Sequence, residues 1–296
     1  MNCIKEPSGR WGGSWTEKKL DAFSKYVWSY LSIMKKHPNW KTIYFDGFAG
    51  SGGRTEDIYK NRPLFEELNI SEESNVYKGS AERVLSLKDN FAFNYYYFID
   101  TDKKTLKNLQ VRIEEKFSES PNIIFRKDDV NNQLLELSTA MKRDKKYAAL
   151  IFLDPFGMQI RWQSICSLQG TRTDIWILLP TGVIVNRLLD KDGKLEHIEK
   201  LTSFFGLAEQ EIREFFYKKE TEQTLFGEEE RIKKVTKPID KIAKLYVQQL
   251  KTIWKFATEK PLVLLNHKNV PIYHLVFASN NKTAVKIASQ IIQREN

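Results

Sequence analysis

The sequence is short of the residues that several classes of protein need. Cysteine occurs twice in 296 residues, as Cys3 and Cys166, which are too few and too far apart for a disulfide framework or a zinc cluster. No apolar run approaches the roughly 20 residues of a membrane span, and residues 1–6 lack the apolar stretch of a signal peptide. We therefore expect a cytoplasmic protein in a reducing setting, with no membrane partner.

Histidine is also scarce. The four histidines lie far apart in the chain and show no metal-ligand spacing, so we predict no metal site. No Ser-His-Asp arrangement stands out, and the lysine of a P-loop is missing after the glycine-rich loop described below. These absences exclude the commonest metal, hydrolase and P-loop nucleotide sites.

Charge is plentiful. Charged residues make up 29% of the chain and hydrophobic residues 41%, with a net charge of +9. A basic protein can approach phosphates because its cations displace counterions from a polyanion. The lysines are scattered, however, so charge alone leaves nucleic-acid binding and its absence equally open.

Short apolar strands alternate with amphipathic helices along most of the chain. The expected strands are 41–45, 95–99, 122–125, 148–153, 174–179, 262–265 and 273–279. Such alternation predicts an α/β fold whose parallel sheet has helices on both faces, and the final strand pair adds an antiparallel strand. We predict a flexible lead over residues 1–14 and a Rossmann-like domain over 15–296. Its sheet should resemble the seven-stranded class I methyltransferase sheet, mostly parallel with the last strand antiparallel.

Residues 181–260 interrupt this alternation. They are rich in lysine and glutamate, and we predict a helical insertion there. It is either a cap or partner-binding region or an ordinary charged insertion, and the composition fits both equally well.

A glycine-rich loop, residues 46–53, follows the first strand directly. Glycines let the chain turn sharply and let a ligand lie against bare backbone. An ordinary turn is the alternative, but the position after a buried strand favours a cofactor site. The predicted cofactor contacts in this loop are Asp46, Gly47, Phe48, Ala49, Gly50, Ser51 and Gly52. For Asp46, bonding to the loop amides is an alternative to ligand contact.

The next helix starts late, at Ser80, after about 26 intervening residues. Its N-terminus can fold back on the loop and offer free amides to a carboxylate such as that of methionine. A plain helix cap at Ser80 is an equally good reading.

Acidic residues end several of the predicted strands. Open α/β sheets bind ligands beyond the carboxyl ends of their strands. Asp100 is placed to accept hydrogen bonds from ribose hydroxyls, and Asp129 to receive an adenine amino group. Asp102 is either a further contact or the cap of the following helix. We include Val130, next to Asp129, among the cofactor contacts.

The strand 148–153 stops at Asp154-Pro155-Phe156-Gly157. Proline after the acid fixes the backbone, and an aromatic ring next to it can stack on a planar group. We predict Asp154, Pro155 and Phe156 as the catalytic residues. The alternative is a strand stop with a core phenylalanine. Near the N-terminus, Lys18 and Lys19 are either cations for a carboxylate or phosphate or, as we favour, part of a solvated helix face.

Together these residues resemble the three-Cys-motif partner proteins (the TcmP family), which have a methyltransferase-like Rossmann fold. The matching segments are Trp15 with Lys19-Leu20, 44–50, Gly79-Ser80, 98–102, 129–131, 152–157 with Trp162, and 273–279. The resemblance implies S-adenosylmethionine as cofactor. It also implies a partner that carries a radical-SAM-like three-cysteine motif, which this chain lacks.

More distantly, Phe-Ala-Gly-Ser-Gly and Asp-Pro-Phe are similar to the motifs of nucleic-acid amino-methyltransferases. The usual form there is Asp-Pro-Pro-Tyr or Asp-Pro-Pro-Phe, and this chain lacks the second proline. Two hypotheses follow. The chain is an S-adenosylmethionine-dependent methyltransferase acting on a nucleic-acid amine, DNA or RNA. Alternatively, it is a non-catalytic or regulatory partner that binds a radical-SAM-like protein through residues 181–260.

Overall fold

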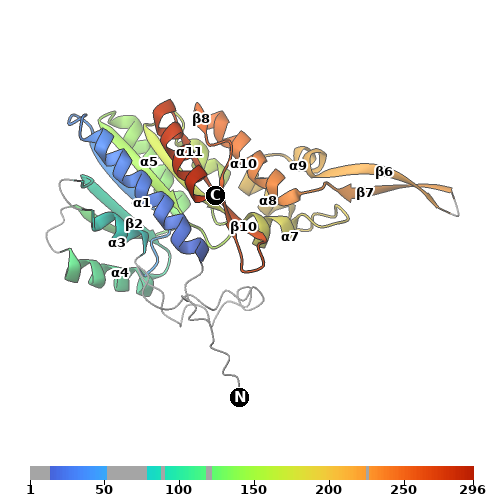
Figure 1. Cartoon of the computed structure of the whole chain (residues 1–296), viewed down its shortest axis with the longest axis horizontal. Coiled ribbons are helices and arrows are strands. Elements are labelled where there is room, and N and C mark those ends of the chain that lie inside the picture. The colour runs from blue at the N-terminus through green and yellow to red at the C-terminus, as the bar shows by residue number, and fades with distance from the viewer. Residues whose placement is uncertain (1–13, 52–78, 88–90, 118–121, 225–226) are drawn as a thin grey trace, which may run out of the picture.

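A computed structural model describes residues 14–51, 79–87, 91–117, 122–224 and 227–296. A mixed sheet with helices on both faces forms the body of the molecule, and a two-stranded hairpin extends from one end of it (Figure 1). The predicted lead at 1–14 and the predicted contact Gly52 lie outside the described residues, except for Ser14, where the first helix begins.

The helical elements are α1 (Ser14–Met34), α3 (Ser80–Leu85), α4 (Lys103–Lys116), α5 (Val130–Arg143), α6 (Trp162–Ser167), the π-helical turn η2 (Thr181–Val185), α7 (Asn186–Leu188), α8 (Ile198–Phe205), α9 (Glu209–Phe216), α10 (Pro238–Ile253) and α11 (Lys282–Glu295). The strands are β1 (Lys41–Asp46), β2 (Tyr95–Asp100), β3 (Ile123–Lys127), β4 (Tyr147–Leu153), β5 (Thr173–Leu179), β6 (Tyr217–Thr224), β7 (Gly227–Lys234), β8 (Phe256–Ala257), β9 (Leu262–Leu265) and β10 (Pro271–Ser279).

The strand order confirms the predicted fold. The sheet runs β3-β2-β1-β4-β5-β10, parallel as far as β5, and β10 is antiparallel to β5. This is the Rossmann-like class I methyltransferase arrangement. The sheet has eight strands because the two-residue strand β8, which the sequence does not predict, pairs with β10 beside β9. Since β8 and β9 share one edge of β10, the sheet keeps the predicted width of seven strand positions.

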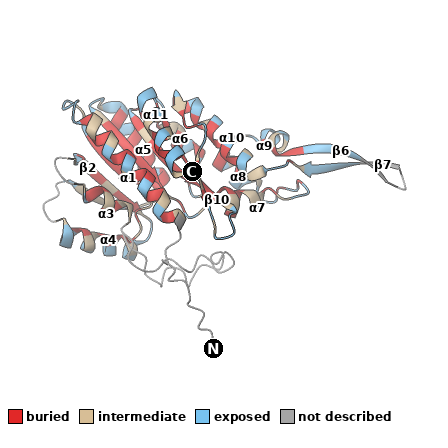
Figure 2. Cartoon of the chain, in the orientation of Figure 1, coloured by how far each residue is buried: buried red, intermediate tan, exposed pale blue. Residues whose placement is uncertain are grey.

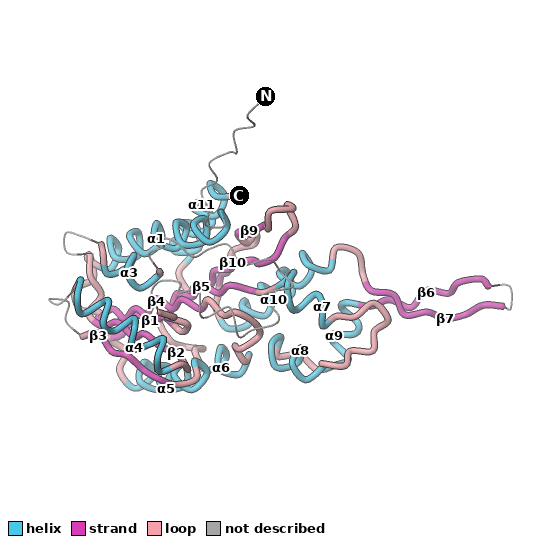
Figure 3. Tube along the Cα trace, turned by 90° about the horizontal axis from the view of Figure 1, so that it is seen from below, coloured by secondary structure: helices cyan, strands magenta, loops and turns pink. Residues whose placement is uncertain are grey.

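Alternate residues of each strand enter two separate cores. Tyr44, Phe98 and Phe152 pack under α1, α3, α4 and α11, whereas Phe45 and Ile151 face α5 and α6. Figure 3 shows α1, α3 and α11 on one side of the sheet and α5 and α6 on the other. The central strands are buried on both faces, as the red ribbon in Figure 2 shows, which explains their nearly continuous apolar sequences.

The prediction for residues 181–260 is wrong in part. Helices occupy much of this segment, but residues 217–224 and 227–234 form an antiparallel hairpin. Lysine and glutamate are good helix formers, so the composition indicated a helix. The two strands instead form a continuous antiparallel ladder, on which Lys219 contacts Glu230 and Lys233 contacts Glu220. Within the described residues, no helix is long and apolar enough to cross a membrane.

Candidate functional site at the carboxyl edge of the sheet

The carboxyl ends of four neighbouring parallel strands meet at one edge of the sheet, which we call the carboxyl edge. Asp46 ends β1, Asp100 ends β2, Asp129 follows β3 and Asp154 follows β4. Because β1 lies between β2 and β4 in the sheet, Asp46 is central among these acids. The four acids therefore share one edge, as predicted, but their surroundings differ.

Asp46 is fully buried, and its carboxylate holds the loop together. One oxygen accepts hydrogen bonds from the hydroxyls of Tyr44, at 2.9 Å, and Ser80, at 2.5 Å, and the other accepts from the amide of Phe48 at 3.3 Å. Burial raises the pKa of Asp46 to about 6, although the three hydrogen bonds act in the opposite direction. Asp46 thus bonds a loop amide, as its alternative interpretation expects, and its contact with a ligand stays a prediction.

Helix α3 folds back on the glycine loop, as predicted, because its first residue supplies the Ser80 hydroxyl to Asp46. The plain-cap reading of Ser80 is wrong. Gly79 occupies the N-cap position, and no side chain caps the helix. The Ser80 hydroxyl therefore links α3 to Asp46 at the end of β1, although the two residues are 34 positions apart in the chain.

Gly47 is needed for packing. A Cβ at this position would lie 2.5 Å from Cδ2 of Leu153 and 2.6 Å from Cγ2 of Val130, while the Gly47 amide donates to the carbonyl of Phe152 at 3.0 Å. Val130 belongs to the buried core. Its side chain fills the space that Gly47 leaves, and its role as a cofactor contact stays a prediction.

Gly50 is different, because a Cβ there would meet nothing within 4 Å. Its φ of +60° is the left-handed conformation that glycine adopts at low cost. The Gly50 amide donates to Oδ2 of Asp100 at 3.1 Å, and the Ala49 amide donates to the carbonyl of Ile99 at 2.9 Å. The loop is thus fixed to β2 and leaves open backbone at Gly50. Ser51, the last described residue of the loop, is buried.

Asp100 and Asp102 have different roles in the structure. The sequence left open whether Asp102 caps the following helix or contacts the cofactor. Asp102 is the N-cap of α4, and its carboxylate accepts from the Thr105 amide at 2.6 Å, which lowers its pKa. The capping alternative is therefore confirmed for Asp102. The Asp102 amide donates to Oδ1 of Asp100 at 2.8 Å. The carboxylate of Asp100 therefore holds both the amide of Gly50 in the loop and the N-cap residue of α4.

Asp129 is held by a residue that the sequence did not identify, Asn131. Oδ1 of Asp129 accepts from the amide and from the side chain of Asn131, both at 2.8 Å. Asn131 also bonds the carbonyl of Gln159 and the amide of Arg161, so it ties the end of β3 to the loop after β4. The Asp129 side chain is 41% exposed, and its Oδ2 accepts no hydrogen bond from the described part of the chain.

Asp154 pairs with a buried lysine, Lys19, which lies 135 positions earlier in the chain. Lys19 Nζ lies 2.5 Å from Oδ2 of Asp154, and the two side chains are 4% and 26% exposed. Lys19 also lies 5.3 Å from the ring of Trp15, which stacks on Tyr273. The preferred reading of Lys19 as part of a solvated face is wrong. A signal was present, since Lys19 lies one helical turn before Phe23 and so within the apolar stripe of α1.

The two residues after Asp154 have opposite environments. Pro155 is buried, whereas Phe156 is 40% exposed, so the alternative of a core phenylalanine is wrong. Past Phe156, the Gly157 amide donates to Oε1 of Gln159 at 2.7 Å. The motif thus presents one carboxylate and one aromatic ring together at the end of β4.

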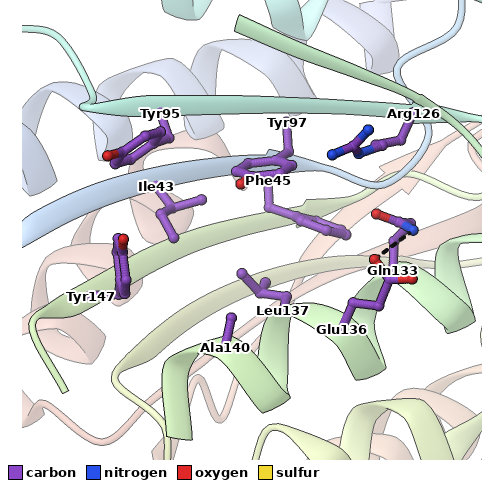
Figure 4. Close-up of a pocket in the computed structure, with 10 residues that line it drawn as sticks. All are labelled: Ile43, Phe45, Tyr95, Tyr97, Arg126, Gln133, Glu136, Leu137, Ala140 and Tyr147. Carbon is purple, nitrogen blue, oxygen red and sulfur yellow. Dashed lines mark hydrogen bonds between the residues drawn. The ribbon is translucent and has the colours of Figure 1, made fainter. Parts of the chain in front are cut away.

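A cavity of about 240 Å³ lies away from this edge, on the sheet face beside α5 (Figure 4). Its walls include Tyr95, Tyr97, Tyr147 and Arg126, and none of the predicted site residues lines it. The cavity is therefore separate from the acids of the carboxyl edge.

No protein-family model matches the chain, and no curated protein matches it either. Among solved structures, similarity extends to a Legionella pneumophila protein of the DUF519 family, with 13% identity over 89% of this chain and 97% of that one, and a TM-score of 0.39. An rRNA methylase from Streptococcus thermophilus is 11% identical over 95% and 100%, with a TM-score of 0.35. Magnesium protoporphyrin IX methyltransferase from Synechocystis, solved with bound S-adenosylmethionine, is 10% identical over 77% and 85%, with a TM-score of 0.29. The strand order of the sheet, and not these similarities, establishes the fold as Rossmann-like and methyltransferase-like.

Proposed function

We propose that the carboxyl edge binds S-adenosylmethionine and that the protein transfers its methyl group to an amine of a nucleic acid. The observation that carries the proposal is the arrangement of Asp154. One of its oxygens is fixed by buried Lys19, the other accepts from no described residue, and Phe156 is exposed beside it.

The residues of the edge fit this cofactor. Gly50 leaves open space where a side chain would stand, and the carboxylate of Asp100, which accepts the Gly50 amide, would accept from the ribose hydroxyls. Oδ2 of Asp129 would accept from an adenine amino group, and the strands β1 and β2 lie between it and Asp154 in the sheet. Asp46 and Ser80 hold the loop in place through their hydrogen bonds, and Val130 packs against Gly47.

When bound, S-adenosylmethionine supplies an electrophilic methyl group on a sulfonium. Asp154 would accept a hydrogen bond from the N–H of the substrate amine and so orient the nitrogen lone pair toward that methyl. Asp154 would also accept the proton that the substrate nitrogen loses once it is methylated. Lys19 keeps the carboxylate in position, and Phe156 would stack on the base.

A second candidate is the non-catalytic partner of a radical-SAM-like three-Cys-motif protein. The Lys19–Asp154 ion pair favours it, since the cation already satisfies part of the carboxylate that the chemistry needs. The single proline of the motif points in the same direction.

Calorimetry with S-adenosylmethionine tests the cofactor site. We expect the intact protein to bind it, and Asp100→Ala to weaken binding by roughly tenfold or more, because hydrogen bonds to a charged group contribute about 1.5–3 kcal/mol. Asp192→Ala, at an exposed position outside the carboxyl edge, is the matched control and should bind like the wild type. Absence of binding by the wild type, alone and with a partner, would exclude the cofactor.

Transfer of labelled methyl to DNA, tRNA, rRNA and protein tests the reaction. Methylation of a nucleic acid that Asp154→Asn abolishes, while binding of S-adenosylmethionine persists, is the expected result. Binding without transfer to any of these substrates would favour the regulatory partner. Transfer to protein alone would overturn the nucleic-acid assignment.

A further inference from the structure

The amino ends of the parallel strands lie at the edge of the sheet opposite the carboxyl edge. Three loops meet there: residues 35–41 lead into β1, residues 142–147 into β4 and residues 168–173 into β5. Because β4 is seven residues long, the two edges are roughly 20 Å apart. A site at the amino ends is therefore distinct from the proposed cofactor site.

Eight exposed lysines and arginines gather in these three loops, and we call them the amino-end patch. Although the lysines are scattered along the sequence, the fold brings these eight together. Asp144 is the only acid in the three loops, and none of the eight cations forms an ion pair within the described part of the chain. The patch consists of Lys35, Lys36, Lys41, Lys142, Arg143, Lys145, Lys146 and Arg172.

Backbone and side-chain contacts hold the three loops side by side. The Lys41 amide donates to the carbonyl of Lys146 at 2.8 Å, and Nη1 of Arg172 donates to the carbonyl of Lys145 at 2.8 Å. The Arg172 guanidinium also lies 4.0 Å from the ring centroid of Trp40. The cations are thus neighbours in space. Like charges repel one another, so this arrangement favours a polyanion as the occupant of the patch.

The tyrosine-lined cavity of about 240 Å³ lies next to the patch. Tyr147, which lines it, directly follows Lys146, and Lys41 is in register with Tyr147 across β1 and β4. Lys41 also alternates along β1 with Ile43 and Phe45, which line the cavity, so these three residues share one face of the sheet. A ligand on the patch can therefore reach the cavity.

The lining of the cavity fits one flat aromatic ring system. Tyr95 and Tyr147 lie at one end, Arg126 and Glu136 lie at the other, and Tyr97 lies between them (Figure 4). Since a cavity of roughly 150 Å³ holds benzene, this one has room for a nucleobase. The edge of a base carries both acceptors and donors, which an arginine and a glutamate can match.

We propose that the amino-end patch and the cavity together bind a single-stranded nucleic acid, with phosphates on the patch and one base in the cavity. The bases of a single strand are free to leave the stack and to pack on aromatic rings, whereas those of a duplex are stacked inside it. This binding is independent of the methyl transfer proposed for the carboxyl edge.

An anionic membrane is the other polyanion that a basic surface can bind. Attachment to a membrane surface usually combines basic residues with exposed apolar residues that enter the lipid. None of the large hydrophobic residues that are exposed in the described part of the chain lies in the three loops. The patch and its aromatic cavity together therefore favour a nucleic acid.

Fluorescence anisotropy with a labelled DNA single strand of about 12 nucleotides, measured over a range of salt concentrations, tests the patch. Lys36→Gln with Lys145→Gln and Lys146→Gln should weaken binding roughly tenfold or more. The slope of log affinity against log salt should also fall by about 2, because each phosphate contact on a single strand contributes about 0.7.

The matched control carries the same change of charge at exposed positions that follow the carboxyl end of β5: Lys191→Gln with Lys194→Gln and Lys200→Gln. Its salt slope should equal that of the wild type. Equal slopes for the patch variant and this control would overturn the proposal, and so would a wild type that does not bind the strand at low salt.

An abasic strand of the same length tests the cavity, because it keeps the phosphates and lacks the bases. The wild type should bind it roughly tenfold more weakly than the normal strand, since the stacking of a base is lost. Ala140→Phe fills the cavity and should abolish this difference. Thr139→Phe, at the exposed neighbouring position on α5 outside the cavity, should preserve it.

Equal binding of the two strands by the wild type would overturn the proposal, as would an undiminished difference in Ala140→Phe. Binding to phosphatidylserine vesicles without binding to the strand would identify a membrane as the occupant instead. Thermal unfolding like that of the wild type would show that the variants fold. Because no S-adenosylmethionine is added, a failure of the proposed methyl transfer leaves these results unaffected.

Discussion

Lysines and carboxylates occur in two very different settings in this molecule: the carboxyl edge of the sheet, and the hairpin of β6 and β7, which we call the arm. At the edge, Lys19 is 4% exposed and pairs with Asp154, and Asp46 is fully buried. On the arm, the paired Lys219 and Glu230 are 75% and 69% exposed. The residue types are the same, but water solvates one set and is excluded from the other.

The physical consequence is that single charges matter for stability at the edge and matter little on the arm. A buried charge without a partner costs several kcal/mol, whereas an exposed ion pair contributes about 0–1 kcal/mol. Loss of one edge residue should therefore disturb folding. Loss of one arm residue should leave folding nearly unchanged.

The largest effect is expected at the Lys19–Asp154 pair. Asp154→Leu leaves the Lys19 ammonium buried without a partner and should destabilise the protein by about 3 kcal/mol or more. Lys19→Met should cost less, because the more exposed Asp154 can be solvated. The double variant should recover most of the loss. Urea unfolding of all four proteins gives the coupling energy, and additive losses would show that the pair is not coupled.

Asp46 comes next, and its effect depends on pH. Its pKa is about 6 in the folded protein against 3.8 for the free side chain, so the folded state binds the extra proton between these values. The stability that this provides is present below about pH 4 and is lost as the pH rises through about 6. Asparagine does not titrate. The free energy of unfolding of Asp46→Asn, minus that of the wild type, should therefore rise by ~3 kcal/mol between about pH 4 and pH 7. Thermal unfolding across this range measures it, and a difference that is flat with pH would contradict the raised pKa.

Alanine substitutions at the two loop glycines should distinguish a glycine needed for packing from a glycine that contacts the ligand. Gly47→Ala forces a methyl group against Leu153 and Val130 and should cost about 2 kcal/mol. Gly50→Ala meets no atom but strains a left-handed residue, at about 1 kcal/mol. If the cofactor lies over Gly50, that variant should also lose affinity for S-adenosylmethionine by calorimetry. Equal affinity for the two variants would remove Gly50 from the site.

The smallest effect is expected on the arm. Glu220→Gln removes the exposed ion pair with Lys233 and should change the free energy of unfolding by less than about 0.5 kcal/mol. Urea unfolding of the variant in low and high salt measures it. A loss as large as that at Asp154 would abolish the contrast between the two regions.

Much of the fold could be predicted from the sequence, because buried strands and amphipathic helices have distinct apolar periods. The glycine loop and the strand-end acids also lie where they were expected. The arm was missed because its strands bury too little for the period to show and consist of good helix formers. Lys19 was missed as a site residue because its partner lies 135 positions away in the chain.

The sequence by itself determined the order of the elements, the strand that precedes each acid, and the glycines that the loop requires. These follow from local periodicity and from backbone conformation. Only the tertiary structure decided the role of each acid: Asp46 as a support, Asp102 as a cap, and Asp154 as a carboxylate held by Lys19. The reason is that a carboxylate's role depends on its exposure and its hydrogen-bond partners, and packing sets both between segments that are distant in the chain.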